Sequence, residues 1–126
     1  MSQNFRPLLN SELRLAVSRW EANQASAKEI YGEINNWDVS QITSFRDVFY
    51  LQENFNSDIS DWDVSNGTDF SGMFYDARAF NQDIGRWDVS SVTSMESMFS
   101  GAASFNQPIS RWDVSSVTSM ESMFDG

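Results

Sequence analysis

The stretch that decides the fold is FNQDIGRWDVSSVTSMESMF, residues 80–99, because most of its letters recur at a fixed distance along the chain. Its tetrapeptide Trp-Asp-Val-Ser occurs four times at a spacing of 25 residues, starting at Trp37, Trp62, Trp87 and Trp112. A period of about 20 to 50 residues is typical of proteins built from stacked repeats. The sequence therefore predicts a stack of 25-residue units, each of which we call a coil.

The repeat extends well beyond the tetrapeptide. When Trp is counted as offset zero, offset 6 is always Thr and offset 12 is always Phe. Other columns hold a Phe-Asn pair, and then an Ile three residues after the Asn, as in Phe80, Asn81 and Ile84. One unit cannot bury its apolar columns alone, whereas stacked units place equivalent side chains above one another and share one core.

Each coil is predicted to hold one short strand and one short helix. Trp87 and Val89 alternate with polar residues, the period of two that indicates a strand with one buried face. The next apolar residues follow helical spacings: Met95, Met98, Phe99 and Ala102. Thr93 with Glu96, and Thr118 with Glu121, have the spacing of a capping box, and Gly101 and Gly126 occupy the position of a left-handed C-cap.

The chain is predicted to be one structural unit with two parts. Residues 1–33 form an N-terminal helical cap, and residues 34–126 form about three and a half coils. A helix starting at Asn10 or Ser11 would place four apolar residues on one face: Leu13, Ala16, Val17 and Trp20. A second apolar set follows, namely Ala27, Ile30 and Ile34. One or two helices should thus shield Trp37 from water.

The pattern of residues 80–99 resembles the BspA-like leucine-rich-repeat surface proteins, with 25-residue repeats of the mycoplasma type. The resemblance covers about residues 30–126, and the segment before it is similar to the helical lead-in of such repeats. It implies an α/β repeat solenoid of leucine-rich-repeat type. It also implies a secreted or cell-surface location and a role in adhesion or protein recognition, and it implies no reaction.

Composition limits the chemistry that is possible. The chain has no His and no Cys, so the commonest general base, nucleophile and transition-metal ligands are missing. We therefore expect no enzyme and no cofactor. The net charge of −10 disfavours nucleic acid and anionic membrane surfaces, and no apolar run is long enough to span a bilayer. The N-terminal residues show no signal peptide, so composition leaves the location unknown.

Two columns of polar residues are predicted to carry structural hydrogen bonds, and for the Asp column a ligand role is the alternative. The Asp column, Asp38, Asp63, Asp88 and Asp113, could bind Ca²⁺ or could accept hydrogen bonds from the N–H groups two residues on. The structural role is the better supported of the two. The Asn column after each Phe predicts an internal ladder in which a buried side-chain amide satisfies backbone groups of a neighbouring coil.

Surface positions differ between coils, as a recognition face requires. Tyr50 and Tyr75 share offset 13, and Arg86 and Arg111 share offset 24. Tyr and Arg are favoured at interfaces, although the same positions could be solvated residues that vary freely. We predict a non-enzymatic protein-binding or adhesion module with a protein or glycan partner. The alternative is a structural subunit that fills space in a larger assembly.

The last coil lacks the Phe, Asn and Ile columns that complete the others. Its strand around Val114 should therefore present unpaired backbone N–H and C=O groups, and four apolar side chains should be uncovered: Trp112, Val117, Met120 and Phe124. We expect self-association there, or cover from a further chain or from more repeats.

Overall fold

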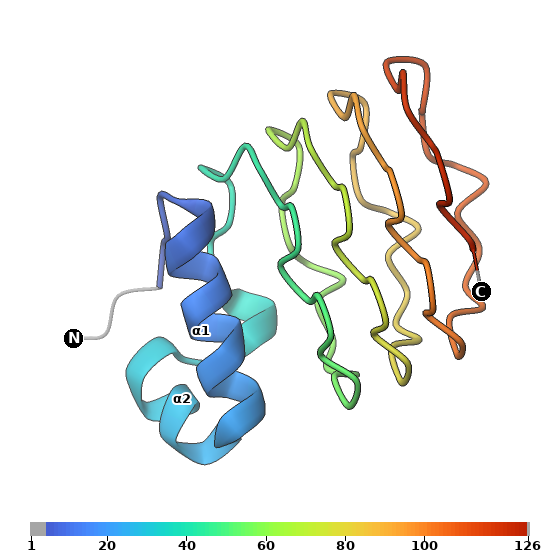
Figure 1. Cartoon of the computed structure of the whole chain (residues 1–126). Coiled ribbons are helices and arrows are strands. Elements are labelled where there is room, and N and C mark those ends of the chain that lie inside the picture. The colour runs from blue at the N-terminus through green and yellow to red at the C-terminus, as the bar shows by residue number, and fades with distance from the viewer. Residues whose placement is uncertain (1–4, 126) are drawn as a thin grey trace.

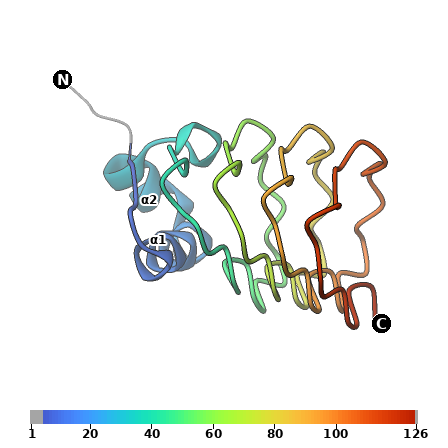
Figure 2. The same cartoon turned by 90° about the horizontal axis from the view of Figure 1, so that it is seen from above.

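The computed structural model describes residues 5–125. Two helices come first, α1 (Asn10–Ala22) and α2 (Gln24–Tyr31), followed by a short 3₁₀ turn, η1 (Ile34–Asn36). The rest of the chain winds into successive coils that lie side by side, with α1 and α2 at one end of the stack (Figure 1). The 90° view shows the same order, from the helices to the C-terminal coil (Figure 2).

The helical cap lies where the apolar spacing predicted it. The predicted face of α1 is buried: Leu13, Ala16, Val17 and Trp20. Its start depends on Glu12, whose carboxylate accepts hydrogen bonds from the backbone N–H groups of Leu8 and Leu9, each at 3.0 Å. Asn23 caps α2 by accepting from the Ser26 N–H at 3.1 Å. Ile30 does not belong to the buried set, because it is 62% exposed.

The helix predicted in each coil is absent from residues 37–125, where tight turns replace it. The Met98 N–H donates to the Met95 carbonyl three residues back, at 3.2 Å. The Phe99 N–H, which would complete a helical turn to Met95, donates instead to the Met123 carbonyl of the next coil at 2.8 Å. Consecutive turns bury the same apolar spacing as one helical turn, so the periodicity alone could not separate the two structures.

The predicted capping boxes are also wrong, because there is no helix for them to cap. The Thr93 hydroxyl donates to the Thr68 carbonyl of the preceding coil at 3.1 Å, and the Thr93 N–H donates to the same carbonyl at 2.8 Å. The invariant Thr column therefore joins coils. Gly101 does have the predicted left-handed backbone, with φ of 73°, and Leu51 and Asp76 share that conformation in the same column. Gly126 lies outside the described residues.

The strand predicted at Trp-Asp-Val-Ser is wrong as well. Within residues 5–125, strand pairing is limited to single parallel bridges at offset 7, which join Ser44, Asp69, Ser94 and Ser119. The tetrapeptide instead runs into a turn, in which the Val92 N–H donates to the Val89 carbonyl at 3.0 Å. The predicted fold class, an α/β leucine-rich-repeat-like solenoid of strand and helix coils, is thus overturned.

A ladder of backbone hydrogen bonds holds each coil to the next. Every second N–H from offset 8 to offset 14 donates to the following coil, and the four bonds from the second coil are 2.8–2.9 Å long: Phe70 to Ser94, Gly72 to Glu96, Phe74 to Met98 and Asp76 to Ser100. The N–H groups between them close turns inside their own coil, as Met73 and Tyr75 do. The N–H groups of this segment thus alternate between hydrogen bonds within their own coil and hydrogen bonds to the next coil.

Aromatic columns fill the space between the two sides of each coil. Phe49, Phe74 and Phe99 stack with nearly parallel rings, at centroid distances of 5.2 and 5.5 Å. The Trp column lies beside them and also carries hydrogen bonds. The Trp87 Nε1 donates to the carbonyl of Ile59, 28 residues earlier in the chain, at 3.1 Å. Trp62 and Trp112 make the equivalent hydrogen bond. The same side chains therefore supply apolar burial and a polar link between coils.

Asn10 satisfies the edge of the first coil. Its Nδ2 donates to the carbonyls of Ser44 and Arg46, at 2.9 and 3.0 Å. In the second coil, the equivalent carbonyls of Asp69 and Ser71 accept from N–H groups of the first coil. One side-chain amide of the cap therefore takes the place of two backbone donors.

Replacing Asn10 with Ala should destabilise the chain by about 1 to 3 kcal/mol, since two carbonyls lose their donor at a partly buried edge. Urea unfolding would measure the change, with Asn36→Ala as a control because Asn36 is exposed. Equal costs for the two variants would contradict the capping role of Asn10.

Gly67 breaks the column that Ile42, Val92 and Val117 occupy, and its neighbours explain why. A Cβ at Gly67 would lie 2.6 Å from Cε1 of Phe70 and 2.9 Å from Cδ2 of Phe45. Phe70 stands where the next two coils have Met. The first coil has Ile42 together with Phe45, so a Phe in the same coil does not by itself exclude a side chain at this offset. Gly67 differs because two rings face it, Phe70 of its own coil and Phe45 of the preceding one.

Gly67→Val should therefore cost about 1 to 3 kcal/mol through overpacking, although it restores the residue of the following coils. Adding Phe70→Met should recover part of that loss, because Met is flexible and removes the closest contact. A double-mutant cycle by urea unfolding measures the coupling. Additive effects of the two substitutions would show that Phe70 does not dictate Gly67.

Candidate functional site

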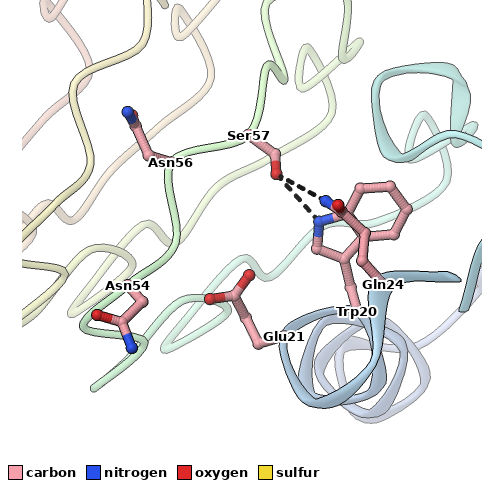
Figure 3. A pocket seen from close by; sticks show the side chains of 6 residues that line it. All are labelled: Trp20, Glu21, Gln24, Asn54, Asn56 and Ser57. Atoms are coloured by element: carbon pink, nitrogen blue, oxygen red, sulfur yellow. Dashed lines mark hydrogen bonds between the residues drawn. The ribbon is translucent and has the colours of Figure 1, made fainter.

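Three surface grooves are candidate sites. The first lies where the helical cap meets the loop of the first coil, and Figure 3 shows the coil segment Asn54–Ser57 facing side chains of α1 and α2. It encloses about 320 Å³ and is lined by six residues: Trp20, Glu21, Gln24, Asn54, Asn56 and Ser57. Trp20 Nε1 and Gln24 Nε2 both donate to the Ser57 hydroxyl oxygen, at 3.0 and 3.4 Å.

This junction groove presents amides and one carboxylate. Trp20 is only 1% exposed, so its ring is not available as a stacking platform. Partial burial raises the pKa of the Glu21 carboxyl. The sequence does not predict this groove, because the apolar spacing places Trp20 only on the buried face of its helix and no pattern links that helix to residues 54–57. Its polar groups can hold a ligand by hydrogen bonds.

The second groove brings together the two tyrosines predicted as recognition residues. Tyr50 and Tyr75 stack at 5.1 Å with an interplanar angle of 23°. The groove encloses about 300 Å³, and its lining also includes Arg46 and Glu96. Tyr50 is 39% exposed, so the pair offers aromatic surface beside both signs of charge.

The third groove brings together the two arginines predicted with them. Arg86 and Arg111 line a space of about 360 Å³ with Asp83, Gly85, Pro108 and Ser110. It shares no lining residue with the tyrosine groove. The four predicted residues therefore divide into two separate pairs and do not form one continuous site.

The Asp column forms turns, as the structural interpretation predicted. The Asp88 carboxylate accepts from the Ser90 N–H at 3.0 Å and from the Ser90 hydroxyl at 2.6 Å. Asp38 and Asp63 bind Ser40 and Ser65 in the same way. Across residues 5–125 no group of three or more acidic side chains is placed to hold a metal ion. The Asp column therefore gains no support as a Ca²⁺ site.

The Asn column forms the predicted ladder between coils, although at the surface and not in the core. The Asn56 Oδ1 accepts from the Asn81 N–H at 2.8 Å, and the Asn81 Oδ1 accepts from the Asn106 N–H at 2.9 Å. Gln82 and Gln107 reinforce it by donating to the carbonyls of Asn56 and Asn81. These amides are occupied in holding the stack.

The strict columns on which this architecture depends match a known family model over residues 14–126, described as "Mycoplasma protein of unknown function, DUF285". The chain belongs to the DUF285 family. The match covers the repeats and most of α1, and it does not specifically show a BspA-like protein. No curated protein and no solved structure matches the chain.

The helices of this DUF285 chain are short. None within the described part of the chain is long and apolar enough to cross a membrane.

Hydrogen bonds to the Asp column make the stability of this DUF285 chain depend on pH. The Ser40 and Ser90 hydroxyls, followed by the backbone N–H groups of the same residues, lower the pKa of Asp38 and Asp88 below its ordinary value. A carboxyl whose pKa is lower in the folded chain than in the unfolded chain stabilises the fold. This stabilisation is complete above the pKa of the unfolded chain, about 3.9, and is lost as the pH falls through the pKa of the folded chain.

We expect the urea midpoint to fall between pH 5 and pH 3, and to fall less in the Ser40→Ala/Ser90→Ala variant. That variant keeps every carboxylate, so net charge is matched at each pH. An identical fall in both proteins would contradict the contribution of these serines.

Proposed function

We propose that the chain is a non-enzymatic protein-binding module that uses exposed side chains of its coils. The contrast between strict and variable columns carries the proposal. Buried columns repeat with little change, whereas the position at offset 13, which is partly or fully exposed in each coil, changes from Tyr50 and Tyr75 to Ser100 and Asp125. The fold does not require tyrosine at that position, since other coils lack it.

The tyrosine pair supplies the chemistry of a contact surface. Tyrosine offers a large, rigid, amphipathic face, and aromatic residues are enriched at the centre of protein interfaces. Tyr50 and Tyr75 hold one another in place by stacking at 5.1 Å, which reduces the side-chain entropy that a partner would have to restrict. Arg46, Asp47 and Glu96 around them provide polar groups for the rim.

The resemblance to BspA-like surface proteins supports the finer proposal that the partner lies at a cell surface and that binding serves adhesion. The runner-up is a structural subunit whose coils join neighbours in a larger assembly. The two differ in how they depend on the tyrosines. A space-filling subunit needs the stack as a whole, whereas a recognition module loses its partner when a few exposed side chains are removed.

The test is a peptide-display selection on the purified full chain, followed by affinity measurements on the selected peptides. We expect Tyr50→Ser/Tyr75→Ser to weaken binding at least tenfold, because aromatic residues at the centre of an interface contribute most of its energy. Leu15→Ser is the control, because Leu15 is 51% exposed on α1 and its loss also removes apolar surface.

Circular dichroism and urea unfolding would establish that both variants keep the fold. Equal binding by the tyrosine variant and the Leu15 variant would contradict the proposed surface. Purification of the native protein in a fixed-stoichiometry complex that survives the tyrosine substitutions would favour the structural subunit.

A further inference from the structure

The column just before each Trp changes the sign of its charge. It holds Asn36, then Asp61, Arg86 and Arg111, while the Trp that follows never varies. Asp61 accepts a hydrogen bond from the Asn35 amide at 3.0 Å and so belongs to the junction with η1. Arg86 and Arg111 are exposed, and the Asp in the earlier coil shows that stacking does not demand a cation here.

The two arginines flank one groove across adjacent coils. The core rings of the same two coils, Phe80 and Phe105, are 5.8 Å apart. Gly85 and Pro108 form part of the lining. A Cβ at Gly85 would lie 2.7 Å from the Pro108 carbonyl oxygen, so the coils approach closely at this point. A side chain at position 85 would therefore press the two coils apart at the groove.

These guanidinium groups differ from the other two in the coils. Arg46 lies 3.9 Å from Asp69, and Arg78 lies 3.8 Å from Glu53. Among residues 5–125, no carboxylate lies within 4.0 Å of Arg86 or Arg111. Their donors are therefore not committed to a carboxylate of the chain.

Two acidic groups lie near the arginines, and both have local hydrogen bonds. Asp83 lines the groove and accepts from the Gly85 N–H at 2.9 Å. Asp58, whose charge interacts with that of Arg86, accepts from the Ser60 N–H at 2.9 Å. Neither carboxylate closes on a guanidinium, so the groove keeps two forked cationic donors.

We infer that this groove binds an acidic segment of a protein partner, with two carboxylates on alternate residues of an extended peptide. Residues i and i+2 of an extended chain lie about 6.6 Å apart, a spacing similar to the 5.8 Å between the Phe80 and Phe105 rings of the two coils that carry the arginines. A guanidinium can hold a carboxylate through two parallel hydrogen bonds, which gives geometric specificity. Pro108 offers apolar contact between the two charged positions. The inference rests on the proposed protein-binding function and names the chemistry of the partner.

The overall charge favours a short acidic segment over an extended polyanion. With a net charge of −10, the chain repels long runs of sulfate or phosphate, whose charges would extend beyond the groove. Two carboxylates seated between two arginines keep the favourable contacts local. A sulfated oligosaccharide is therefore the competing ligand that the experiment must exclude.

The experiment measures binding of a fluorescent ten-residue peptide, with two Asp residues separated by one residue, to the full chain. We expect Arg86→Gln and Arg111→Gln each to raise the Kd at least tenfold. Arg14→Gln removes the same charge from α1 and should leave the Kd within about twofold. The Arg86→Lys/Arg111→Lys variant keeps both positive charges but loses the paired N–H donors of the guanidinium groups, so it should bind the peptide more weakly than the native chain.

Several results would overturn the inference: no binding, equal binding of a peptide with Asn in place of both Asp, unchanged Kd in the Gln variants, or tighter binding of a sulfated oligosaccharide of equal charge. The tyrosine variants separate this inference from the proposed function. If the acidic peptide fails while peptides selected by display still require Tyr50 and Tyr75, only the arginine groove is wrong. If the acidic peptide binds and the tyrosines have no effect, the tyrosine surface is wrong.

Discussion

The backbone ladder between coils is the interaction on which the rest of the structure depends. A chain that turns tightly inside each coil cannot satisfy every N–H within that coil, so alternate groups must find partners elsewhere. The next coil supplies them at regular distances of 2.8–3.0 Å. This requirement fixes the register of the stack, and the register places each Phe and Trp column in line. The aromatic core is therefore organised by backbone pairing as well as by apolar burial.

Much of this arrangement could be predicted from the sequence, because the repeat identifies equivalent positions. The 25-residue period, the buried columns, the Asx turns, the Asn ladder and the apolar face of α1 all follow from residue type and spacing. Secondary structure inside the coil did not follow. Met95, Met98 and Phe99 have helical spacing, yet the Phe99 N–H pairs with another coil. A local pattern contains no information about a donor whose acceptor lies 24 residues away.

The candidate sites could also be predicted only in part. Variation within a strict repeat pointed to Tyr50, Tyr75, Arg86 and Arg111, and each pair lies together because stacking aligns a column. Nothing in the sequence showed that the pairs line separate grooves. The junction groove was missed because it depends on how α1 packs against residues 54–57, and that packing is unique in the chain. A sequence repeat predicts the contacts that every coil makes. Contacts that occur once in the chain are found only in the three-dimensional structure.

The match between Gly67 and Phe70 limits how such a chain can change by exchange between its repeats. A crossover that replaces a whole coil moves both residues together and keeps the close contact compatible. A crossover between offsets 5 and 8 of the second coil would put the Val of a later coil at position 67 and bring its Cβ to 2.6 Å from Cε1 of Phe70. Phe45 of the preceding coil also faces Gly67, so the order of coils matters as well as their content. Despite their similar sequences, the coils are not interchangeable parts.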